Sequence, residues 1–82
     1  MTTAPAFTIG IEEEYLLVDP ATCALRTAPP ALLTDLKDAL GDQVSTEFLG
    51  CQVEVGTGVC ATVADARTDL THLRRTVARI AR

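Results

Sequence analysis

Three consecutive glutamates, Glu12, Glu13 and Glu14, interrupt the otherwise apolar segment TIGIEEEYLLVD. Its Ile, Tyr, Leu and Val residues favour a β-strand, whereas Glu is depleted from strands. Side chains alternate across a strand, so Glu12 and Glu14 share one face and Glu13 points to the other. A further carboxylate, Glu54, stands in the middle of the apolar run QVEV. Because Mg²⁺ takes oxygen ligands, commonly one or two carboxylates plus substrate phosphates, Glu12, Glu14 and Glu54 form a candidate metal site if their strands are neighbours.

The spacing of the acidic run is also compatible with roles that involve no metal. An antiparallel sheet can leave one face in water, and a solvated acidic face accounts for the spacing equally well. Paired carboxylates also serve glycoside hydrolysis, but the chain has no Trp, one Tyr and two Phe to stack on sugars. The run GTG lacks the Gly-Lys-Ser/Thr of a phosphate-binding P-loop. His72 has no evident catalytic partner and is expected to be a surface or half-buried helix residue.

Composition limits the class of protein. The chain has 82 residues, which predicts one domain, and its 48% apolar content predicts a folded one. The net charge of −4 argues against nucleic-acid binding. The first residues resemble no secretory signal and the apolar runs are too short to span a bilayer, so we expect a soluble cytoplasmic protein with no membrane partner. Cys23, Cys51 and Cys60 form no metal-binding pattern and are expected as free thiols.

The elements that must position the glutamates follow from periodicity and turn residues. A strand is predicted over residues 7–18, followed by a turn at Asp-Pro and a short returning strand at 24–26. A helix is predicted within residues 27–42, starting near Pro30 and stopping at Gly41. A second long strand is predicted within residues 44–60. Its apolar face comprises Leu49, Cys51, Val53 and Val55, and its other face carries Gln52 and Glu54.

A final helix is predicted from Thr62, a good N-cap residue, to the end of the sequence. Its apolar stripe comprises Val63, Ala66, Leu70, Leu73, Val77 and Ile80. Its solvent-exposed face is expected to carry Arg67, Arg74, Arg75 and Arg79. The element order is strand, hairpin, helix, strand, helix, an α+β arrangement in which the helices leave the sheet half covered.

Two of these segments together resemble a known family. FTIGIEEEYLLVDPAT resembles the opening of the carboxylate–amine ligases related to glutamate–cysteine ligase type 2, and QVEVGTGVCATVADARTDL resembles that family's second block. The resemblance covers nearly the whole chain. It implies a glutamine-synthetase-like catalytic fold, in which an antiparallel sheet curves around the active site and helices lie outside it.

The resemblance also implies an activity and a set of site residues. Family members are ATP-dependent ligases that activate a carboxylate, typically that of glutamate, as an acyl phosphate, which an amine such as that of cysteine then attacks. In that pattern Glu12 and Glu14 bind Mg²⁺ or Mn²⁺, Glu54 lies near metal or amino-acid substrate, and Gln52 lines the substrate pocket. Glu13 faces away and is the weaker candidate.

The family's members are several-fold longer than this sequence. We therefore interpret residues 1–82 as the N-terminal portion of a single ligase catalytic domain, inactive alone, with the nucleotide-binding residues downstream. Unpaired strand edges favour association into a homo-oligomer. The alternative is a non-enzymatic interaction module that presents an amphipathic helix and strand edges to a partner chain.

Overall fold

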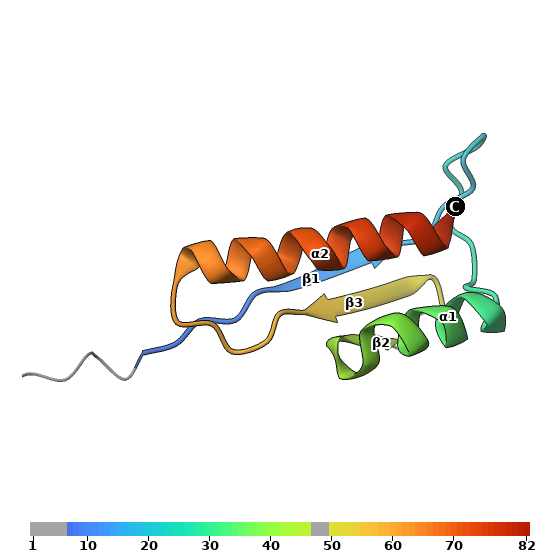
Figure 1. Cartoon of the computed structure of the whole chain (residues 1–82). Helices are drawn as coiled ribbons and strands as arrows, with labels where there is room; N and C mark the ends of the chain where they lie inside the picture. Colours follow the sequence, from blue (N-terminus) through green and yellow to red (C-terminus); the bar gives the residue numbers. More distant parts are fainter. Residues whose placement is uncertain (1–6, 47–49) are drawn as a thin grey trace, which may run out of the picture.

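The computed structural model of the chain describes residues 7–46 and 50–82. Its elements in chain order are β1 (Glu12–Leu16), α1 (Pro30–Leu40), the short 3₁₀ helix η1 (Gly41–Gln43), β2 (Val44–Thr46), β3 (Gln52–Gly56) and α2 (Val63–Ala81). The described strands form a three-stranded antiparallel sheet in the order β1-β3-β2. Both helices pack beside this sheet, with α2 running along β1 and β3 (Figure 1). The predicted α+β class is confirmed.

The first strand is shorter than predicted. β1 covers residues 12–16, and the flanking parts of the expected strand form isolated bridges, Ile9 with Cys60 and Val18 with Leu25. β1 pairs with β3, which itself ends at Gly56. An extended segment is a strand only where it has a hydrogen-bonding partner, so the length of β3 limits β1.

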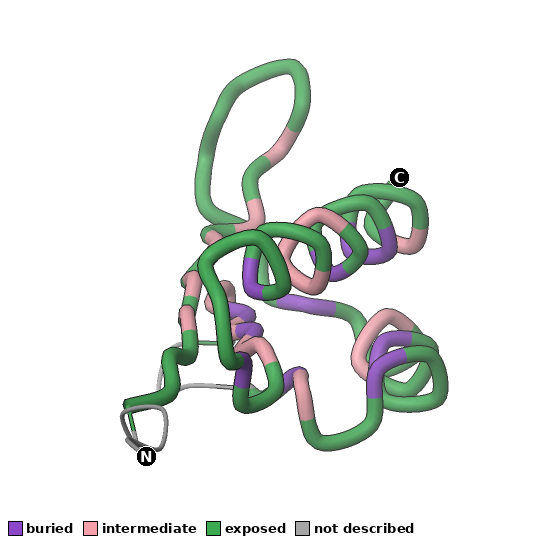
Figure 2. The backbone as a smooth tube through the Cα atoms, turned by 60° about the vertical axis from the view of Figure 1, so that its left-hand side comes forward, coloured by how far each residue is buried: buried purple, intermediate pink, exposed green. Residues whose placement is uncertain are grey.

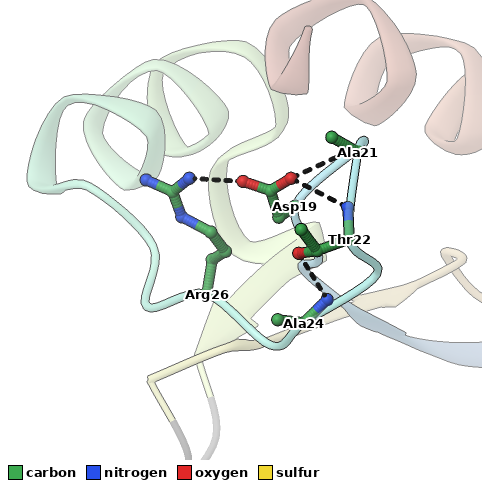
Figure 3. Close-up of polar contacts among 5 residues, drawn as sticks. All are labelled: Asp19, Ala21, Thr22, Ala24 and Arg26. Carbon is green, nitrogen blue, oxygen red and sulfur yellow. Dashed lines mark hydrogen bonds and ion pairs between the residues drawn. The ribbon is translucent and has the colours of Figure 1, made fainter.

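The predicted turn after β1 is confirmed, but the returning strand is reduced to the Val18–Leu25 bridge. The Asp19 carboxylate accepts hydrogen bonds from the backbone N–H of Ala21 at 2.8 Å and of Thr22 at 3.1 Å, and pairs with Arg26 at 3.0 Å (Figure 3). These two backbone donors, and then the Arg26 guanidinium, hold the pKa of Asp19 below its usual range. The Asp-Pro sequence thus builds a turn closed by its own side chain.

The prediction of a second long strand is wrong. The chain reverses direction within this segment and forms two shorter strands. Val44 to Thr46 form β2, Gln52 to Gly56 form β3, and the two pair with Val44 opposite Val55. Of the predicted apolar face, Val53 and Val55 are buried and Cys51 is half-buried, while Leu49 lies outside the described residues. The predicted alternation within β3 therefore holds, although its strand is shorter.

The two helices begin and end as predicted. Pro30 is the first residue of α1, where its missing N–H is not needed, and Gly41 follows the helix with φ of 57°. At the start of α2, Thr62 Oγ1 accepts a hydrogen bond from Asp65 N at 3.1 Å. Val63 is a correction to the predicted stripe: it is 73% exposed, because it lies at the first turn of α2, away from the core.

The core lies between one face of the sheet and the two helices. Figure 2 shows the buried parts of α1 and α2 on their inner sides. The cluster comprises Leu36, Leu40, Val44, Val53, Val55, Leu73 and Val77. The residues of β1 and β3 that alternate with the core positions point to the opposite face, which neither helix covers. The prediction of a half-covered sheet is confirmed.

An acidic open face as the candidate functional site

Strand pairing brings the predicted metal ligands to one face of the sheet. β1 and β3 are neighbours, and in their register Glu14 lies directly opposite Glu54, while Glu12 lies opposite Gly56. Glu12 and Glu14 are exposed and Glu54 is half-buried. The condition stated from the sequence, that the two strands be adjacent, is therefore met. Whether these carboxylates bind a metal stays a prediction.

The ladder sets how close Glu14 and Glu54 lie. Leu17 N donates to Cys51 O at 2.8 Å and Thr57 N donates to Ile11 O at 2.9 Å, so the odd-numbered residues of β1 occupy hydrogen-bonded pairs. The Glu14–Glu54 pair consequently belongs to the non-hydrogen-bonded class, in which Cα atoms approach to about 4.5 Å and side chains are closest. Like charges directly opposite one another destabilise a sheet, so a cation between them would relieve a repulsion.

Gln52 joins this face. Its Nε2 donates to Glu14 Oε1 at 2.5 Å, a contact between neighbouring positions of β3 and β1. This hydrogen bond engages one oxygen of the Glu14 carboxylate and so orients the group. Gln52 lies beside Glu14 on the face that also carries Glu54. The substrate-binding role expected for it stays a prediction.

The donor chemistry of this face suits a hard cation in part. Within residues 7–46 and 50–82, no three Asp, Glu, His or Cys side chains are placed so as to hold a metal ion by themselves. A pair of carboxylates such as Glu14 and Glu54 nevertheless matches the usual protein share of a Mg²⁺ site, which is completed by water and substrate phosphates. The residues therefore fit a metal shared with a nucleotide better than an all-protein metal cage.

Glu13 points to the helix-covered face, as predicted, and has a partner that sequence reasoning missed. Both its carboxylate oxygens bind the guanidinium of Arg74 on α2, with Arg74 Nε at 2.7 Å from Oε1 and Nη2 on Oε2. Tyr15 donates its hydroxyl to the same Oε1 at 2.6 Å. Arg74 first, and then Tyr15, lower the pKa of Glu13 to about 2. Arg74 is exposed, as predicted, but it also forms an ion pair between α2 and β1.

The Tyr15 hydroxyl should titrate far above the usual tyrosine range. Burial, and then the hydrogen bond to Glu13, raise the pKa of Tyr15 to about 12. Tyr15 is the chain's one tyrosine and there is no tryptophan, so phenolate absorbance reports it directly. We expect a midpoint near 12, lowered by Glu13→Gln because the neighbouring negative charge is gone. Circular dichroism at the same pH values supplies the control, and a midpoint at about 10 with a native spectrum would contradict the contact.

The other side chains singled out from the sequence are His72 and the three cysteines. His72 is exposed on α2, as predicted for a helix surface residue. Cys23 is exposed, Cys51 half-buried and Cys60 buried, and all three are free. In the part of the chain that the structure describes, neither helix combines the length and the apolar character needed to cross a bilayer.

The fold and this face together define an α+β segment whose sheet exposes paired carboxylates. Residues 8–82 match the model of glutamate–cysteine ligase family 2, and the chain belongs to that family.

Several curated relatives are close in sequence. The chain is 63% identical over 75 residues to the "Putative glutamate--cysteine ligase 2" of Jannaschia sp. (strain CCS1), an alignment that covers 92% of this chain and 20% of the relative. It is 56% identical over 79 residues to the protein of the same name from Paracoccus denitrificans (strain Pd 1222), covering 96% and 21%. The chain thus spans about a fifth of the length of these relatives. No solved structure matches it, so the glutamine-synthetase-like architecture stays a prediction.

Proposed function

We propose that this chain forms one wall of the active site of a cytoplasmic ATP-dependent carboxylate–amine ligase. The supporting observation is that a member of glutamate–cysteine ligase family 2 places Glu14 and Glu54 opposite one another on a sheet face that neither described helix covers. Family membership favours this enzyme over the alternative of an interaction module. Because the chain spans a fifth of its relatives' length, the complete site needs further polypeptide.

In the proposed reaction, the γ-phosphoryl group of ATP passes to a carboxylate of glutamate, giving an acyl phosphate and ADP. The amine of cysteine, or of another amine substrate, then attacks the acyl carbon, forming the amide and releasing phosphate. Phosphoryl transfer depends chiefly on positioning and on neutralising charge. A bound Mg²⁺ or Mn²⁺ supplies that neutralisation.

Each residue of the acidic face has a role in this proposal. Glu14 and Glu54 hold the divalent ion from neighbouring strands, and Glu12 supplies a further carboxylate on the same face. Gln52 orients Glu14 through its hydrogen bond and contacts the amino-acid substrate. Strands are rigid mounts, which keeps such ligands near the geometry the reaction needs.

The test compares this 82-residue chain with a polypeptide of the relatives' length that carries it. Both are incubated with ATP, Mg²⁺, glutamate and cysteine, and ADP and the amide product are quantified by coupled assay and mass spectrometry. We expect product from the long polypeptide and none from residues 1–82. Omission of the amine, replacement of cysteine by other amines, and removal of the metal define the reaction. A long polypeptide that turns over no ATP with any amino acid would refute the proposal.

A further inference from the structure

The apolar pattern of β1 does not decide which of its faces points to the core. Tyr15 and Leu17 face the helices, whereas Leu16 and Val18 alternate with them and are 53% and 46% exposed. Shifting a strand by one residue exchanges its two faces. Such a shift would bury Leu16 and Val18 in place of Tyr15 and Leu17. The free energy of apolar burial therefore differs little between the two registers.

The backbone contacts of β1 also do not determine which of its faces points to the core. Ile11 N donates to Thr57 Oγ1 at 2.9 Å, and Leu17 N donates to Cys51 O at 2.8 Å. Any residue can donate its backbone N–H in this way, so a shifted strand could form equivalent bonds. β1 also lies at an edge of the described sheet, where it pairs with β3 alone.

Two side-chain contacts distinguish the glutamates: Gln52 donates to Glu14 on the open face, and Arg74 binds Glu13 on the helix-covered face. Of the two, only the contact with Arg74 pairs a glutamate with an opposite charge. The guanidinium binds both carboxylate oxygens of Glu13, and Tyr15 Oη binds one of them, so the inward glutamate is matched in charge and in hydrogen bonds. A one-residue shift would turn Glu12 and Glu14 inward together. Two carboxylates would then share one arginine on the face that carries Val53 and Val55, so they would repel each other and at most one of them could keep the two-oxygen contact.

We infer that Arg74 is a positioning residue, whose guanidinium selects Glu13 as the inward glutamate and thereby aims Glu12 and Glu14 at the open face. The selection concerns the register of β1 only. Its value for catalysis rests on the proposed function, because that function needs Glu14 opposite Glu54.

Disulfide trapping reads the register directly in the 82-residue chain. In the observed register residue 16 lies opposite residue 52, in a non-hydrogen-bonded pair, and on the other face from Cys51. Leu16→Cys with Gln52→Cys and Cys51→Ser therefore cross-links only in the observed register. Leu16→Cys opposite the native Cys51 cross-links after a shift in one direction, and Val18→Cys opposite Cys51 after a shift in the other. Glutathione disulfide is the oxidant, and peptide mapping identifies each bridge.

Arg74→Met is the main variant because it keeps the apolar stem and the helix propensity while removing the guanidinium. With Arg74 present, we expect the 16–52 bridge and only background amounts of the two shifted bridges. In Arg74→Met, the shifted bridges should rise several-fold. Arg75→Met, which loses the same charge one residue further along α2, should behave as the unmodified chain. The exchanged pair Glu13→Arg with Arg74→Glu should restore the 16–52 bridge.

Circular dichroism accompanies each reaction, so that loss of the fold is recognised. If Arg74→Met unfolds the chain, Arg74→Lys is tested instead, because lysine keeps the charge but cannot bind both carboxylate oxygens at once. Shifted bridges above background in Arg74→Lys support the inference, and their absence overturns it. A folded Arg74→Met that yields the 16–52 bridge alone also overturns it. The readout needs neither metal nor nucleotide, so its failure is distinct from a failure of the ligase assay.

Discussion

Leu73→Ala is expected to remove a large part of the chain's stability against unfolding at room temperature. Leu73 is fully buried in the centre of α2 and belongs to the cluster that joins both helices to β2 and β3. Truncating such a leucine removes about 2–5 kcal/mol from the free energy of unfolding. Small domains have total stabilities near the lower end of the usual range of about 5–15 kcal/mol. Urea titration followed by circular dichroism measures the loss.

Val63→Ala is the matched control for this prediction. It also truncates an apolar side chain of α2, but Val63 is 73% exposed, and exposed substitutions usually change stability by about 0.5 kcal/mol or less. The two variants differ in burial, not in the kind of change. Equal losses of stability in both would contradict the described packing of α2 on the sheet.

Local features of the fold could be predicted from the sequence because their causes lie within a few residues. Thr62, Pro30 and Gly41 mark helix ends through their own backbone and side-chain chemistry, and the structure uses all three in that way. Alternation along a strand likewise separates Glu13 from its neighbours without any knowledge of the partner strand. These predictions are confirmed.

Features that depend on distant residues could not be predicted. The reversal between β2 and β3 falls in a stretch where Gly50 is the main turn-type residue, which is a weak signal beside the surrounding apolar positions. Arg74 and Glu13 are 61 residues apart, and an arginine on the polar face of a helix gives no sign of its partner. The exposure of Val63 depends on which turns of α2 contact the core, and the apolar periodicity of the helix does not predict this.

The candidate site is intermediate between these cases. Glu12, Glu14 and Glu54 could be chosen by residue type and by resemblance, and their sharing of one face required only that two strands be neighbours. Their register was not predictable, because it follows from the loops and contacts that hold β1 against β3. The register matters most for the chemistry, since it places Glu14, and not Glu12, directly opposite Glu54.

Glu14→Gln is expected to change stability and activity in opposite directions. It removes one of two like charges facing each other across the sheet, while the amide oxygen can still accept the hydrogen bond from Gln52. In metal-free buffer, the 82-residue chain should gain about 0.2–1 kcal/mol of unfolding free energy. In the polypeptide of the relatives' length, kcat/KM should fall on the order of 100-fold or more, because loss of even an outer contact to a metal costs about 10–100-fold. Urea titration and the coupled ADP assay measure the two effects.

Two neighbouring glutamates supply the controls. Glu12→Gln makes the same change opposite Gly56, where no like charge faces it across the ladder, so its gain in stability should be smaller. Glu13→Gln makes the same change on the covered face and weakens the contact with Arg74, so stability should fall. The proposed metal site, in which a cation relieves the repulsion between Glu14 and Glu54, predicts this contrast among three adjacent glutamates. If Glu14→Gln and the unmodified polypeptide have equal activity at every Mg²⁺ concentration, the proposed metal site on this face is refuted.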